Sequence, residues 1–381
     1  MAIALPVYLD YASTTPIDER VLQKMLPYFN TYYGNPSSKA HAFGWIAEEA
    51  VQVAREQIAS LINCQTEEII FTSGATEAVN LSLRGITENA SQRRHIISIA
   101  TEHRAVLDTL AILEKKGFDV TYLPVDENGK IKIEDLLAQI RADTLLIACM
   151  YANNETGVIH PVNEIGHIAK EKNIFFFCDA TQGVGKIPVN IEQDGIDMMA
   201  FSSHKMYGPK GVGALYVRRK NPRVELISQI TGGGQEKDRR SGTLNVAGIV
   251  GFGEAARLCQ LEMKEESKRI LTLRNQLESL LIEKNDAIIH GMNTHRLPNI
   301  SNVYLPHYEG SNLITDLCTR LAVSAGSACN SGSTKGSHVL SAMGISAEAI
   351  KKTVRISIGR MTTMEDMINT IDMIGMICKG S

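Results

Sequence analysis

The sequence predicts an α/β protein: a large domain with a mostly parallel seven-stranded sheet sandwiched by helices, followed by a smaller α+β domain. Three observations predict this fold class. Short apolar runs alternate with helix-length segments between residues 66 and 217. Several of these runs are apolar on both faces, which is typical of strands covered by helices on each side. The alternation stops after Gly251, where a long helical pattern takes over.

The predicted strands are short and mostly apolar. There are seven of them: Glu68–Thr72, His95–Ile99, Val120–Leu123, Leu145–Met150, Ile174–Cys178, Met198–Ser202 and Gly213–Val217. The segments between them have the length and spacing of helices: Thr76–Arg84, Arg104–Lys116, Ile133–Ile140 and Asn163–Lys172. An alternation of strands and helices favours a mostly parallel sheet with helices on both faces.

The remaining segments predict helices around this sheet and a second domain after it. Trp45–Ile62 has the apolar spacing of an amphipathic helix, and a longer helix is expected from about Phe252 to Lys284. Strand-like pieces follow it at Ile300–Leu305, Ala322–Ala325 and Val354–Ile358. We expect a large domain over residues 15–255, and a small C-terminal domain that combines residues 1–14 with 256–381.

Composition excludes several classes of protein. The chain has 381 residues, of which 44% are hydrophobic and 21% charged, as in ordinary globular proteins. Lys plus Arg total 39 and Asp plus Glu total 42, which argues against nucleic-acid binding driven by bulk charge. No apolar run approaches the roughly 18 residues of a membrane-spanning helix, and the N-terminus lacks the basic start of a signal peptide. We therefore expect a cytoplasmic protein without direct nucleic-acid or membrane partners.

The seven cysteines are an odd number, and no two have C-x-x-C spacing. A disulfide framework and a zinc ribbon are both disfavoured by this pattern, and no metal site is expected. Nucleotide-binding motifs are missing as well. The glycines at 208, 211 and 213 reverse the G-x-G-x-x-G spacing, and Gly185-Lys186 lacks the Ser or Thr of a phosphate-binding P-loop.

Polar groups follow the carboxyl ends of the predicted strands, where open α/β sheets bind their ligands. Gly74 precedes a predicted helix, whose free N–H groups attract an anion. Asp179 follows four apolar residues, and Lys205 follows another strand beside His204. A phosphate cradle, an acid for a pyridinium nitrogen and a Schiff-base lysine are together what pyridoxal 5'-phosphate requires.

Over nearly its whole length, the chain resembles the cysteine desulfurases of the NifS/IscS type. These belong to the class V aminotransferase family of fold-type I pyridoxal-phosphate enzymes. Many short strings in one order carry this resemblance: Tyr8–Pro16, Gly34–Ser38, Thr72–Glu77, Thr101–His103, Asn153–Gly157, Ser202–Gly211, Arg240–Thr243 and Ser327–Cys329.

The resemblance implies roles for residues around the cofactor ring. Lys205 would form the Schiff base and later move protons, and Asp179 would pair with the pyridine nitrogen. His103 would stack on the ring and serve as acid or base. Asn154 and Gln182 would approach the ring and its phenolic oxygen.

The resemblance also implies phosphate and substrate contacts. The phosphate would be held by Ala75, Thr76, Ser202 and His204, together with Thr243 from the other subunit of a homodimer. The substrate L-cysteine would be bound by Asn35, Asn154 and Arg355. Arg355 would grip the substrate carboxylate through a bidentate fork that Lys could not reproduce.

Cys329 lies in the run Ser324–Ser337, which is small, polar and without regular periodicity, a composition that favours a mobile loop. The resemblance implies that the Cys329 thiolate takes the sulfur of the substrate as a persulfide and that alanine leaves. A sulfur-accepting protein would then collect the sulfur. Iron–sulfur cluster assembly, tRNA thiolation and DNA phosphorothioation all remain open as its purpose.

Two other classes of function stay open at this level. Another class V enzyme, such as an aminotransferase or a selenocysteine lyase, would use the same cofactor site. A sulfur carrier or scaffold with vestigial catalysis would keep only the binding role.

The sequence also departs from IscS-type relatives in two places. Gln235 stands where they usually have His, and they usually continue beyond the position of Ser381, which weakens the assignment to housekeeping cluster assembly.

Overall fold

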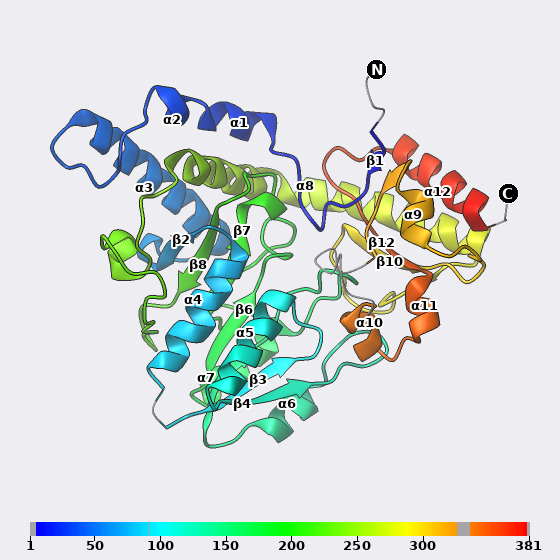
Figure 1. The fold of residues 1–381 in the computed structure, drawn as a ribbon, viewed down its shortest axis with the longest axis horizontal. Coiled ribbons are helices and arrows are strands. Elements are labelled where there is room, and N and C mark those ends of the chain that lie inside the picture. Colours follow the sequence, from blue (N-terminus) through cyan, green and yellow to red (C-terminus); the bar gives the residue numbers. More distant parts are fainter. Residues whose placement is uncertain (1–4, 91, 326–335, 379–381) are drawn as a thin grey trace.

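The protein is described by a computed structural model covering residues 5–90, 92–325 and 336–378 (Figure 1). Within these ranges seven strands form the central sheet, as predicted, and each end lies within two residues of its expected position. In spatial order they are β2 (Ile69–Thr72), β8 (Gly213–Val217), β7 (Met198–Ser202), β6 (Phe175–Asp179), β5 (Thr144–Ala148), β3 (His95–Ile99) and β4 (Asp119–Leu123).

The sheet is mostly parallel because only β8 runs against its neighbours. It pairs antiparallel with both β2 and β7, whereas the pairs from β7 through β4 are parallel. The carboxyl ends of the parallel strands therefore meet at one edge of the sheet. Asp179 and Ser202 are the last residues of β6 and β7 at that edge.

Helices cover both faces of the sheet and bury an apolar layer on each. Residues of α3 (Ala42–Ile62), α6 (Ile133–Gln139) and α7 (Val162–Glu171) belong to one layer. Residues of α4 (Ala75–Glu88) and α5 (Arg104–Lys115) belong to the other. Burial of these two layers is the main stabilising term for the sheet. The predicted sandwich is thus confirmed.

The longest described helix, α8 (Val246–Asn285), passes from the sheet to the second unit (Figure 1). It starts six residues before the predicted position because Asn245 caps it, accepting a hydrogen bond from the Gly248 amide. The helix crosses residues 255 and 256 without a break. The proposed large and small domains therefore share one continuous helix rather than a linker.

The second unit has its own apolar core and its own sheet. In the described chain this sheet runs β12 (Thr353–Ser357), β10 (Ile300–Tyr304) and β9 (Ile288–Ile289), all antiparallel. The N-terminal β1 (Val7–Tyr8) pairs with β11 (Leu321–Ala322), which supports grouping residues 1–14 with this unit. The other described helices are α1 (Glu19–Met25), α2 (Pro27–Asn30), α9 (Leu313–Leu317), α10 (His338–Ala342), α11 (Ala347–Lys351) and α12 (Met364–Cys378).

Gly213 on β8 provides a test of how the sheet packs against the start of α4. A Cβ at this position would lie 2.6 Å from the Gly74 Cα and 2.8 Å from the Phe201 carbonyl oxygen, both backbone atoms that cannot move aside cheaply. We expect Gly213→Ala to lower the free energy of unfolding by about 1–3 kcal/mol, measured by urea titration.

Gly375→Ala in α12 is the matched control, because the nearest atom to its new Cβ is 3.6 Å away. Removing a glycine from a helix should leave stability unchanged or raise it by up to about 1 kcal/mol. Equal unfolding midpoints for the two variants would contradict the tight packing of Gly213 on Gly74.

Candidate active site

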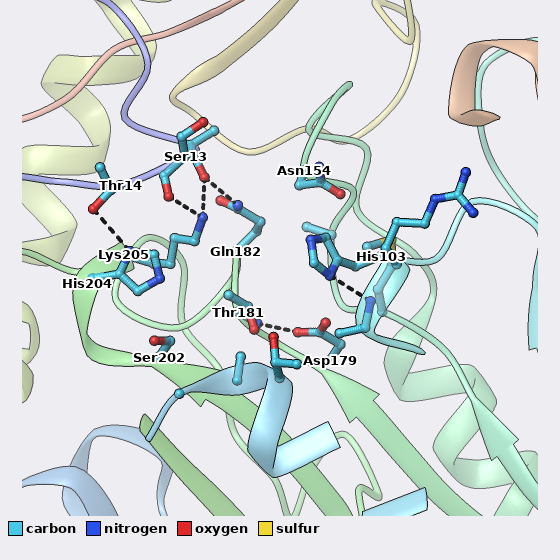
Figure 2. Close-up of a pocket in the computed structure, with 18 of the residues that line it drawn as sticks. Ser13, Thr14, His103, Asn154, Asp179, Thr181, Gln182, Ser202, His204 and Lys205 are labelled. Carbon is cyan, nitrogen blue, oxygen red and sulfur yellow. Dashed lines mark hydrogen bonds between the residues drawn. The ribbon is translucent and has the colours of Figure 1, made fainter. Parts of the chain in front are cut away.

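A cavity of about 520 Å³ opens at the carboxyl ends of the parallel strands, between the large sheet and the second unit (Figure 2). Its size suits a cofactor together with a small substrate. Ten of the residues predicted for the site line it: Ala75, Thr76, His103, Asn154, Asp179, Gln182, Ser202, His204, Lys205 and Arg355.

The start of α4 forms one end of the cavity. Gly74 is the residue directly before α4, and Ala75 and Thr76 are the first two residues of the helix. The first N–H groups of a helix have no partner within it, and they face an anion together with the positive end of the helix dipole. Ser202 and His204 line the same cavity, and Ser202 Oγ would lie 3.8 Å from a Cβ built on Gly74. This end of the cavity could hold an anion such as a phosphate group.

Asp179 is an acidic residue of the cavity wall. Its side chain is buried at the end of β6, where Oδ1 accepts a hydrogen bond from the Thr181 amide at 3.0 Å. Glu102 is completely buried, and burial, with a smaller contribution from Asp179, raises the pKa of its carboxyl well above the usual range. Burial therefore favours the neutral form of Glu102.

Lys205 stands across the cavity from Asp179 and His103 (Figure 2). It ends a short 3₁₀ turn directly after β7. Its Nζ donates hydrogen bonds to the carbonyl oxygens of Ala12 at 2.7 Å and Ser13 at 2.6 Å. Gln182 Nε2 donates to the same Ala12 oxygen at 2.9 Å. The N-terminal segment therefore holds both polar side chains at the cavity.

Arg355 on β12 is held by the same segment. Only 2% of its surface is exposed. Its Nη2 donates to Asp10 Oδ1 at 2.6 Å and Ser13 Oγ at 2.8 Å, and its Nη1 donates to the Asn154 carbonyl oxygen at 2.9 Å. A fixed guanidinium fork at a cavity wall suits recognition of a carboxylate.

Burial keeps two cavity histidines neutral. His103 caps α5, and its Nδ1 accepts a hydrogen bond from the Ala105 amide at 3.1 Å, so its ring proton is assigned to Nε2. Burial lowers the pKa of His103, although the charge of Asp179 opposes this shift. Burial, with smaller contributions from Lys205 and Lys210, lowers the pKa of His204 to about 4.

Two described residues that were predicted for the site, Asn35 and Thr243, do not line the cavity. Asn35 is exposed between α2 and α3, and its Oδ1 accepts a hydrogen bond from the Ser37 amide in a local turn. Thr243 is also exposed and does not line the cavity of its own chain. Cys329 lies outside the described residues. Gln235, the noted departure, does not line the cavity either, and its Oε1 accepts from the Gly242 amide.

Several cavity residues were given no role from the sequence. Ala12 and Ser13 contribute carbonyl oxygens, which every residue type carries, so their identity holds no signal. Glu155 and His338 also line the cavity. His338 directly follows the polar run Ser324–Ser337, and this position next to the cysteine segment was the available signal.

The described residues contain no group of three or more His, Cys, Asp or Glu side chains that could hold a metal ion. None of the helices observed there is long and apolar enough to cross a membrane.

With the geometry in view, comparison with known proteins identifies the family. The model of the aminotransferase class-V family matches residues 7–369. The chain belongs to this family, whose members depend on pyridoxal phosphate. Within it, the NifS/IscS-type resemblance predicted from the sequence is confirmed by the relatives described next.

Two relatives are named cysteine desulfurase IscS. The protein of Anaeromyxobacter sp. (strain Fw109-5) is 48% identical over 97% of this chain and 92% of its own length. The protein of Neisseria gonorrhoeae is 50% identical over 96% of this chain and 91% of its own length. Among solved structures, a NifS-like protein has a TM-score of 0.88 and 38% identity, covering 97% of this chain and 98% of its own. A structure titled "SspA in complex with cysteine" has a TM-score of 0.81 and 36% identity. The match covers 93% of this chain and 99% of that one.

The protonation of His204 can be tested in cofactor-free protein. Because its folded pKa of about 4 lies below the usual value, the unfolded chain binds this proton more readily, and the stability His204 contributes is lost as pH falls from about 6.5 towards 4. We expect the ¹⁵N signal of its ring, assigned with His204→Gln, to stay that of a neutral imidazole down to about pH 5.

Inorganic phosphate should raise the pKa of His204, because an anion in the cradle favours the imidazolium form. The same titration repeated with phosphate checks this. A midpoint near pH 6.5 that phosphate does not move would contradict both the burial of His204 and its place in the anion cradle.

Proposed function

We propose that this protein is a pyridoxal-phosphate-dependent L-cysteine desulfurase that converts cysteine to alanine and passes the sulfur to an acceptor. The observation that carries the proposal is the arrangement of Lys205, Asp179 and the α4 N-terminus around one cavity that Arg355 also enters. The names of the relatives favour this reaction over another class V activity. The structure of one relative, whose title records a complex with cysteine, supports the substrate.

The cavity residues fit the cofactor at three points. The first turn of α4, with Ser202 and His204, would hold its phosphate, and the Asp179 carboxylate would keep its ring nitrogen protonated. Lys205 lies within the same space and would hold the cofactor covalently. When bound, the cofactor accepts the electron pair left at the substrate Cα after proton removal.

The remaining side chains would bind the substrate and move its protons. Arg355 would bind the carboxylate and fix the direction of the Cα–H bond. Lys205, once released from the cofactor, would take the α-proton and return one later. His103 would stack on the ring and present its Nε2–H as a hydrogen-bond donor. Asn154 and Gln182 would contact the cofactor edge.

Cys329 would carry out the sulfur transfer. Its thiolate attacks the substrate sulfur, so that an S–S bond forms and the Cβ–S bond breaks. The bonding electron pair stays with the three-carbon product, which gains protons and leaves as alanine. The described flanks of the cysteine segment support this role: the Arg355 amide donates to the Ser324 carbonyl oxygen at 2.7 Å, and Ser337 Oγ donates to Glu155 Oε2.

A homodimer would complete the site. Asn35 and Thr243 are exposed in the single chain, which suits contacts across an interface. Large apolar side chains exposed around α2 and α3, among them Phe29, Tyr33 and Trp45, support burial of this surface by a second copy. We propose the cytoplasm as the compartment and a sulfur-accepting protein as the partner.

Two variants test the proposal. Lys205→Ala should lose the yellow colour of the bound cofactor and all release of alanine from cysteine. Cys329→Ala should keep the colour but lose sulfide release in the presence of a thiol reductant, because no thiolate remains to take the sulfur. Absorbance, alanine assay and sulfide assay check both. Full sulfide release by Cys329→Ala would contradict the persulfide step.

Arg355→Lys tests recognition of the carboxylate. Loss of the bidentate fork should raise KM for cysteine by about tenfold to a hundredfold, with a smaller change in kcat. Cysteamine, which lacks the carboxylate, is the control substrate, and the preference for cysteine over cysteamine should shrink by a similar factor. An unchanged preference would remove Arg355 from the substrate site.

A further inference from the structure

His338 makes one directed contact at the cavity wall. It is the first residue of α10, which Ser337 caps, and its Nε2 lies 2.9 Å from the carbonyl oxygen of Glu102. A carbonyl oxygen only accepts, so His338 Nε2 carries the proton. Its Nδ1 is buried and has no hydrogen-bond partner among the described residues. The contact with Glu102 is thus the polar link of this ring to its surroundings.

The Glu102 carbonyl belongs to the peptide bond that leads into His103. His103 follows at once as the cap of α5, with its Nδ1 occupied by the Ala105 amide. This leaves Nε2–H as the free donor of the His103 ring. A rotation of the 102–103 peptide would move the capping residue and turn that donor away. His338 anchors this peptide through its hydrogen bond to the Glu102 carbonyl oxygen.

We propose that His338 is a positioning residue: its Nε2–H holds the Glu102–His103 peptide so that the His103 ring presents a hydrogen-bond donor to the cavity. The proposal rests on the proposed function for its catalytic consequence, and it adds a residue from the second unit to the machinery of the large sheet. His338 and Ser337, bonded to Glu102 and Glu155, thereby tie the end of the cysteine segment to two cavity residues.

The charged and titratable groups near His338 agree with a neutral ring that acts as a donor. Burial lowers its pKa, and Arg104 and His103 act in the same direction. The hydrogen bond to Glu102 and the charge of Asp108 oppose the shift. A buried Nδ1 cannot reach a substrate, so a direct proton transfer by His338 is disfavoured.

Three variants separate the donor role from simple packing. His338→Gln keeps an N–H near the Nε2 position, whereas His338→Leu removes the donor but keeps bulk. His290→Leu is the matched control, because His290 is a buried histidine of the second unit, 8% exposed, that does not line the cavity. His338→Asn, which is too short to reach Glu102, replaces the leucine variant if that variant does not fold.

We expect His338→Leu to lower kcat by about tenfold to a hundredfold with KM within about twofold, because a misplaced group costs rate rather than binding. His338→Gln should stay within about threefold of the parent, and His290→Leu should lose thermal stability but keep kcat. Unchanged kcat in His338→Leu would overturn the proposal. A His338→Gln variant as slow as His338→Leu would also overturn it, since the imidazole itself would then be required.

A second readout does not depend on activity. In cofactor-free protein labelled with ¹⁵N-histidine, the His103 ring should be uniformly the Nε2–H form, and His338→Leu should broaden this signal or mix the two tautomers. An unperturbed His103 signal would overturn the positioning role. If the parent protein formed no alanine from cysteine, the proposed function would fail while this measurement still tested the hydrogen-bond chain.

Discussion

Two carbonyl oxygens near the N-terminus, those of Ala12 and Ser13, are the constraint on which the site depends. They accept the hydrogen bonds of Lys205 Nζ, and the Ala12 oxygen also accepts from Gln182. The Ser13 hydroxyl and Asp10 meanwhile hold Arg355 from the second unit. One short segment thus fixes the lysine on the cofactor side and the arginine on the substrate side relative to each other.

Burying these charged side chains costs free energy, and the cost is offset only when their hydrogen-bond partners are in place. Arg355 is nearly inaccessible, and removing one partner of such a buried pair typically costs about 3–5 kcal/mol because a charge is left without compensation. The neutral state of Glu102 and the low pKa values of His103 and His204 limit the number of charges in the cavity. Asp179, Lys205 and Arg355 are the ionisable cavity residues to which the proposed tasks are assigned.

Much of the fold could be predicted because its signals are local. Runs that are apolar on both faces marked the seven strands, and polar residues at their ends marked the cavity. The direction of β8 had no such signal, since the apolar run Gly213–Val217 would fit either direction. The start of α8 was missed although Asn245 is a common capping residue.

The site was predicted where side-chain type carries the chemistry, as at Lys205 and Asp179. It was not predicted where the contact is made by backbone or depends on distant segments coming together. The Ala12 carbonyl is a backbone contact of this sort. The hydrogen bond from His338 to the Glu102 carbonyl joins two segments that are far apart in the sequence. Asn35 and Thr243 do not line the cavity of the single chain, and only the proposed homodimer would bring them to a site.

In the proposed reaction, sulfur moves from cysteine bound in this cavity to Cys329, and alanine is released. A single turnover, with cysteine added to the holoenzyme in the absence of reductant, tests it most directly by peptide mass spectrometry and alanine quantification. We expect one alanine per subunit and one added sulfur atom on the peptide containing Cys329, and on no other cysteine peptide. Alanine without added sulfur on Cys329, or transfer of the amino group to a keto acid without alanine, would contradict it.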